Sequence, residues 1–159
     1  MRVVVLGVGN ILLSDEGVGV RAVEALQEAY AFPPEVEVLD GGTLGMELLD
    51  PLAGADHLII ADCIKAGQTA GTLLRYAGDQ VPAFFRTKIS PHQVGMSDVL
   101  ATLKLMGQEP GSVTLHGIQP ASMETGMELT SLIAERLPAL VQALAADIQA
   151  LGFTVLPQA

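Results

Sequence analysis

Three side chains in this sequence form a metal-binding set if the fold brings them together: the carboxylates of Glu16 and Asp62 and the imidazole of His92. Two carboxylates and one imidazole provide oxygen and nitrogen donors that suit divalent transition metals. Three protein ligands also leave coordination positions open for water or for a substrate. These residues therefore predict a metal-contacting site, provided that they meet in space.

Each of these three residues also has an ordinary structural explanation. An acid in the first turn of a helix, such as Glu16 or its neighbour Asp15, is stabilised by the helix dipole by about 0.3–1 kcal/mol. Asp62 can cap the turn that follows it, and His92 can be an exposed loop residue. Because ligands so distant in sequence share no local signature, spacing alone leaves both interpretations open.

Asp40 is a fourth candidate, in the segment Asp-Gly-Gly-Thr. On local grounds the segment favours a turn, because Asp caps turns and Gly accepts a positive φ. The functional interpretation places the Asp40 carboxylate at the same edge of the sheet, near Glu16 and Asp62.

Cys63 beside Asp62 suggests a thiol protease with His92 as the base. Neighbouring side chains in a strand point to opposite faces, however, so Cys63 would face away from Asp62. No cation close to it in the sequence guarantees a thiolate, and a buried structural cysteine is favoured.

A dinucleotide site is also suggested, because an apolar strand is followed by Gly7-Val8-Gly9. Leu12 stands where the third glycine of that fingerprint belongs. Asp15 and Glu16 would also repel a pyrophosphate at the helix amino terminus, so nucleotide binding is disfavoured.

Alternating apolar segments predict the elements that position these residues. We expect Ser14 to cap the first helix, residues 77–95 to be mostly loop, and the helix near residue 46 to stop at Asp50-Pro51. The last helix carries Pro138, which predicts a kink. Strands are expected at residues 3–6, 35–39, 57–61, 72–76 and 113–118, and helices at 18–29, 46–49, 98–106 and 129–151.

This order of strands and helices predicts one α/β domain over residues 1–159, with a mainly parallel, twisted five-stranded sheet and helices on both faces. Ligands bind such sheets beyond the carboxyl ends of the strands. Glu16 follows the first strand, Asp62 follows the third, and His92 lies in the loop after the fourth. The fold therefore supports a shared site at that edge.

Composition excludes several classes of function. Half of the 159 residues are hydrophobic and 16% are charged, which favours a packed globule. The net charge of −10 argues against nucleic-acid binding, and no segment reaches the roughly 20 apolar residues of a membrane span. The single Cys63 and an amino terminus that lacks signal-peptide character lead us to expect a cytoplasmic protein.

A series of motifs extends this interpretation to a family. In their order and spacing they resemble the hydrogenase maturation endopeptidases over residues 1–151, and the Ser-Pro-His-Gln loop is most similar to the branch that serves membrane-associated uptake hydrogenases. The motifs are VLGVGNILL at residues 5–13, DEG at 15–17, DGGT at 40–43, GMELL at 45–49, HLIIAD at 57–62, KISPHQ at 88–93 and GIQP at 117–120.

The resemblance implies an endopeptidase that removes a carboxy-terminal extension from the nickel-loaded precursor of a nickel–iron hydrogenase large subunit. Carried over by position, Glu16, Asp62 and His92 would contact nickel that belongs to the substrate. Asp40 would be the catalytic or substrate-positioning carboxylate of an aspartyl-type protease. Whether nickel polarises the scissile carbonyl or a carboxylate activates water stays open.

The alternative to a protease is a non-catalytic, nickel-binding maturation chaperone that uses the same three ligands. For either function we expect a cytoplasmic monomer whose partner is the large-subunit precursor, with no affinity for nucleic acid or membranes.

Overall fold

Six consecutive buried residues form β1 (Val3–Val8), which lies within the sheet rather than at its edge. β1 pairs in parallel with β3 (Val36–Gly42) on one side and with β4 (His57–Cys63) on the other. β6 (Ser112–Ile118) continues the parallel order beside β4, and β5 (Leu73–Ala77) closes the sheet antiparallel to β6. The strand order β3-β1-β4-β6-β5 confirms the predicted five-stranded, mainly parallel sheet.

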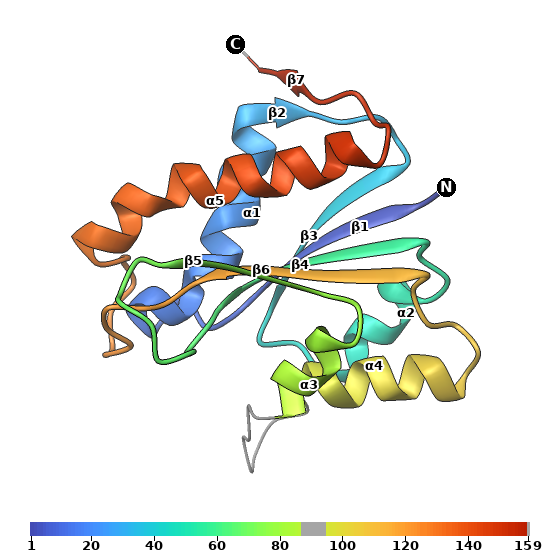
Figure 1. Ribbon diagram of the computed structural model, residues 1–159, viewed down its shortest axis with the longest axis horizontal. Coiled ribbons are helices and arrows are strands. Elements are labelled where there is room, and N and C mark those ends of the chain that lie inside the picture. The colour runs from blue at the N-terminus through green and yellow to red at the C-terminus, as the bar shows by residue number, and fades with distance from the viewer. Residues whose placement is uncertain (87–94, 159) are drawn as a thin grey trace.

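The computed structural model describes residues 1–86 and 95–158, and helices cover both faces of its sheet (Figure 1). This arrangement confirms the predicted layers. In the described part of the chain, no helix combines the length and the apolar character needed to cross a bilayer. The helices are α1 (Val18–Ala29) and α5 (Ser131–Ala150) on one face, and α2 (Leu49–Leu52), α3 (Gln80–Arg86) and α4 (Met96–Leu105) on the other.

Alternation along β1 divides the apolar core in two. Val3 and Val5 pack in the cluster that contains the apolar side chains of α1 and α5. Val4 and Leu6 pack in the cluster that contains those of α2, α3 and α4. A strand that is buried on both faces needs apolar residues at every position, which explains the unbroken run at the start of the sequence.

Short elements complete the fold. A 3₁₀ turn, η1 (Ser14–Gly17), leads into α1, and a second one, η2 (Met46–Leu48), leads into α2. β2 (Tyr30–Ala31) pairs antiparallel with β7 (Leu156–Pro157), which joins the end of α1 to the carboxy-terminal segment.

The prediction that Ser14 caps α1 was wrong. The residue that precedes α1 is Gly17, and Ser14 lies at the start of η1 with a φ of 52°, in the left-handed region. The Ser14 hydroxyl donates to the carbonyl oxygen of Glu124 at 2.6 Å, and α1 has no side-chain cap. A contact with a residue so far along the chain cannot be inferred from local sequence.

Two further predictions near proline need correction. The predicted loop 77–95 contains a helix that was not expected, α3 at Gln80–Arg86, and residues 87–94 lie outside the described part of the chain. The predicted stop at Asp50-Pro51 is also absent, because α2 continues to Leu52. Both Pro82 and Pro51 lie in the first turn of a helix, where the missing N–H has no intrahelical acceptor to lose.

Gly19 allows the start of α1 to pack directly against the sheet. A Cβ at this position would lie 2.1 Å from the carbonyl oxygen of Ala61 and 2.5 Å from that of Val8. No side chain fits such a gap, so only glycine permits this approach. The chain that carries Glu16 is thereby held against the carboxyl ends of β1 and β4.

Candidate metal-contacting site

Asp62 is the penultimate residue of β4 and is only 1% exposed. Its Oδ1 accepts the Cys63 backbone N–H at 2.7 Å. The neighbours Ala61 and Cys63 belong to the cluster beside α1 and α5, so alternation points the Asp62 side chain toward the layer of α2, α3 and α4. A buried carboxylate at the carboxyl end of a central strand matches the position predicted for a ligand.

Glu16 lies in η1 and is partly exposed. Its backbone is fixed on two sides. The Glu16 N–H donates to the carbonyl oxygen of Leu13 at 3.1 Å. The Glu16 carbonyl oxygen packs so closely on Gly9 that a Cβ at Gly9 would lie 2.1 Å from it. Because η1 also contacts β4, the elements that carry Glu16 and Asp62 meet at the same edge of the sheet.

His92, the third predicted ligand, lies outside the described residues. Within residues 1–86 and 95–158, no three side chains of His, Cys, Asp or Glu are arranged to hold a metal ion. A complete three-residue set therefore stays a prediction that depends on His92.

Asp40 lies near the end of β3, with its side chain exposed. The two glycines after it end β3 and begin the predicted turn: Gly42 has a φ of 47°, and the Leu44 N–H donates to the Gly41 carbonyl oxygen at 2.8 Å. In the sheet register, Asp40 of β3 pairs with Gly7 of β1, and Gly7 pairs with Ala61 of β4. Asp40 therefore lies at the same carboxyl edge as Asp62. Because Asp62 is one residue beyond Ala61, the side chains of Asp40 and Asp62 leave opposite faces of the sheet.

Asp15 has a structural role that sequence reasoning missed. It is fully buried, and its Oδ2 accepts the N–H groups of Ala121 and Ser122, both at 3.0 Å. Its Oδ1 accepts the Thr130 N–H at 2.9 Å, and the Thr130 hydroxyl donates to the same carboxylate. We call this group of contacts the Asp15 latch, because it holds the loop between β6 and α5 against η1.

The latch is extended by backbone contacts between the same two segments. Leu13 and Gly126 form an isolated parallel bridge, in which Ser14 donates to Gly126 and Gly126 donates to Leu12. In Figure 1 the loop before α5 and the turn before α1 lie side by side at the left. The partners of Asp15 are more than 100 residues away in sequence, so no local signal could have found them.

Cys63 is 1% exposed and packs in the cluster beside α1 and α5. The prediction that it faces away from Asp62 is confirmed. His116 is also buried, and its Nε2 lies 2.5 Å from Oδ2 of Asp147, which in turn pairs with Arg75. These contacts join α5 to β5 and β6, in agreement with a structural role for His116.

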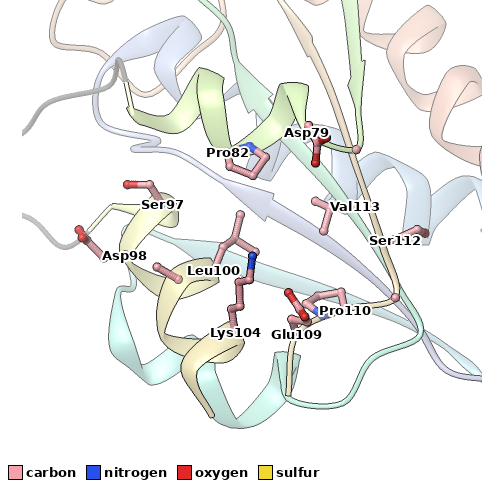
Figure 2. A pocket seen from close by; sticks show the side chains of 13 residues that line it. Asp79, Pro82, Ser97, Asp98, Leu100, Lys104, Glu109, Pro110, Ser112 and Val113 are labelled. Carbon is pink, nitrogen blue, oxygen red and sulfur yellow. The ribbon is translucent and has the colours of Figure 1, made fainter. Parts of the chain in front are cut away.

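A cavity of about 720 Å³ lies elsewhere, between α3, α4 and the start of β6 (Figure 2). Ser112 and Val113, which line it, are at the amino end of β6, whereas Ile118 at the other end is level with Cys63. Glu16, Asp40 and Asp62 do not line this cavity. It is therefore separate from the edge that carries the predicted ligands.

Comparison with known proteins adds a family assignment. Residues 20–147 match the family model described as hydrogenase maturation protease. The Hydrogenase 2 maturation protease of Escherichia coli K12 is 53% identical over 148 residues, which cover 92% of this chain and 90% of that protein. The hydrogenase expression/formation protein HupD of Rhodobacter capsulatus is 44% identical and is covered to 74% of its length, with 97% of this chain matched.

Solved structures agree with these sequence relatives. The hydrogenase maturating endopeptidase HybD from Escherichia coli superposes with a TM-score of 0.95 at 46% identity, covering 99% of this chain and 98% of that one. The nickel–iron hydrogenase maturation protease HycI from Thermococcus kodakarensis KOD1 superposes with a TM-score of 0.72 at 25% identity, covering 91% and 90% of the two chains.

Proposed function

The chain belongs to the hydrogenase maturation protease family and is an endopeptidase of hydrogenase maturation, and within that role we propose that it removes a carboxy-terminal extension from the nickel-loaded precursor of a nickel–iron hydrogenase large subunit. The observation that carries this proposal is the meeting of η1 and β4, which brings the elements of Glu16 and Asp62 to one edge of the sheet.

In this proposal the nickel ion is part of the substrate, and the protease contacts it through Glu16, Asp62 and His92. Oxygen donors from two carboxylates and nitrogen from an imidazole suit a divalent transition metal. The Asp62 carboxylate is held in place by its hydrogen bond from the Cys63 N–H, and the backbone of Glu16 is held by the packing of η1 on Gly9. Ligands that are fixed before binding lose little conformational entropy when they engage the ion.

Contact with the ion would position the adjoining peptide for hydrolysis. Holding a scissile bond in a productive orientation contributes several kcal/mol to the lowering of a reaction barrier, roughly 7–11 in the best cases. We propose Asp40 as the catalytic or substrate-positioning carboxylate, which would make the enzyme aspartyl in type. Its exposed side chain at the carboxyl end of β3 supports this assignment.

We further propose that the enzyme acts as a monomer in the cytoplasm. The chain has a single cysteine, Cys63, which is buried and reduced. With no internal disulfide to form, the protein does not need an oxidising compartment. Specificity would come from two requirements, a loaded metal and a folded partner, so that an unloaded precursor is left intact.

The direct test incubates the purified protein with nickel-loaded large-subunit precursor and follows the precursor by mass spectrometry. We expect release of one carboxy-terminal fragment from the loaded precursor and none from nickel-free precursor. Tight binding without any fragment would overturn the proteolytic reaction and favour a nickel-binding chaperone.

A Cys63→Ala variant is expected to process the loaded precursor at the wild-type rate. Cys63 packs inside the apolar core on the face opposite Asp62, so the thiol has no path to the peptide. Loss of one buried sulfur should lower the free energy of unfolding by about 1 kcal/mol. Fragment release and urea denaturation measure the two effects, and an inactive but folded variant would restore the thiol mechanism.

A further inference from the structure

Three segments at the carboxyl edge of the sheet, residues 9–17, 40–48 and 119–130, have an unusual combination of charge and apolar exposure. Together they contain six carboxylates and no lysine or arginine. One of the six, Asp15, is buried in its latch, which leaves five at the surface or partly exposed. We call these three segments the edge platform.

The edge platform also exposes large apolar side chains. Leu12 is 53% exposed and Met127 is 62% exposed, and they flank the bridge between Leu13 and Gly126. Leu44 and Met46 are 49% and 41% exposed in the segment after β3. Burying apolar side chains of this size is favourable for any partner that can cover them.

The platform is preformed, because hydrogen bonds join its three segments to one another. The Asp15 latch and the Leu13–Gly126 bridge join residues 9–17 to residues 119–130. The hydrogen bond from Gly9 N–H to the Gly42 carbonyl oxygen joins residues 9–17 to residues 40–48. A preformed surface of this kind binds without the entropic cost of ordering its loops.

A cation beside the platform, Arg21, is already paired. Arg21 reaches the platform from α1, but its guanidinium donates to the Met127 carbonyl oxygen and pairs with Glu24. At Glu47, backbone N–H donors, its own and that of Gly45, lower the pKa of the carboxyl below its ordinary value. Glu124 and Glu128 are exposed on either side of Met127.

From these features we infer that the edge platform is the docking surface for the folded body of the large-subunit precursor, which would present an apolar patch bordered by lysine and arginine side chains. This inference rests on the proposed function, because the platform includes η1, which carries Glu16 and contacts β4, the strand of Asp62. Apolar contact supplies affinity at such a surface, and opposite charge supplies orientation and speed of association. The scissile peptide then needs little affinity of its own.

The apolar part of the surface is tested with the double variant Leu12→Ser and Met127→Ser. Its dissociation constant for nickel-loaded precursor, measured by titration calorimetry, should rise at least about tenfold, while the rate of fragment release at saturating precursor stays within about twofold of wild type. The matched control is Leu105→Ser with Met106→Ser, which changes the same two residue types at 89% and 53% exposure at the end of α4. The control should bind like wild type.

The electrostatic part is tested with Glu124→Gln and Glu128→Gln together. Binding should weaken about threefold at low salt, and the difference from wild type should vanish at high salt, where exposed charges are screened. Glu28→Gln with Glu109→Gln, exposed away from the platform, is the control and should change neither value.

The outcomes separate this inference from the proposed function. Wild-type protein that binds and cleaves, together with a Leu12→Ser, Met127→Ser variant of unchanged affinity, would overturn the docking surface alone. Wild-type protein that binds through the platform but releases no fragment would overturn the proteolytic proposal alone. A wild-type protein that does neither would overturn both.

Discussion

Replacing Asp62 with asparagine is expected to lower the rate of fragment release from loaded precursor by at least about a hundredfold while the fold is retained. The amide oxygen of asparagine can still accept the Cys63 N–H, so the local hydrogen bond survives. What is lost is the negative charge of a proposed ligand, and even changes to residues behind a ligand typically cost about 10–100-fold in metal affinity or activity. Mass spectrometry measures the rate of fragment release, and circular dichroism spectra show whether the fold is retained.

Asp56→Asn is the matched control for this variant. Asp56 precedes the amino end of β4, and its Oδ2 accepts the Arg2 N–H. It therefore offers a carboxylate with a similar backbone contact at the opposite edge of the sheet, and its replacement should leave processing unchanged. His92→Ala should lose processing as Asp62→Asn does. A fully active Asp62→Asn protein would contradict the assignment of Asp62 as a ligand.

Replacing Asp15 with asparagine is expected to lower the free energy of unfolding by at least about 1–3 kcal/mol. Oδ2 accepts the N–H groups of Ala121 and Ser122, and Oδ1 accepts that of Thr130. Asparagine keeps only one of these two oxygens, so the donors on the other side would face an amide NH2 group that cannot accept them. Each buried donor left without an acceptor costs about 1–3 kcal/mol. Urea denaturation followed by circular dichroism measures the loss, since the chain has no tryptophan for fluorescence.

Glu16→Gln provides the comparison one residue along the chain. Glu16 is partly exposed, so its replacement should change the free energy of unfolding by less than about 0.5 kcal/mol. The same variant should lose processing, because Glu16 is a proposed ligand. Equal stability losses in the Asp15 and Glu16 variants would show that the latch does not have the importance that its contacts suggest.

The contrast between these two neighbours shows what could be predicted from sequence. The strands were predictable because buried parallel strands require continuous apolar runs, as in β1 and β4. The carboxyl edge then followed from topology, which placed Asp62 at a strand end. The role of Asp15 was not predictable, because burial and distant backbone donors give no local pattern.

Boundaries near proline failed for a different reason. Pro82 and Pro51 suggest helix ends when they are considered alone, yet each lies in the first turn of a helix, where proline is tolerated. The antiparallel direction of β5 was also not predicted. Direction depends on how the chain crosses the sheet, which the composition of five residues does not encode.

Asp62 and Glu16 approach the edge from different layers, Asp62 from the side of α2, α3 and α4 and Glu16 from the turn that leads into α1. A cation bound by both would link the two helical layers directly, in addition to their packing on the shared sheet. Binding of the loaded precursor would then reduce the motion of both layers, and release of the trimmed product would restore it. Amide hydrogen exchange on both sides of the sheet would therefore slow when the precursor binds and recover after the product leaves.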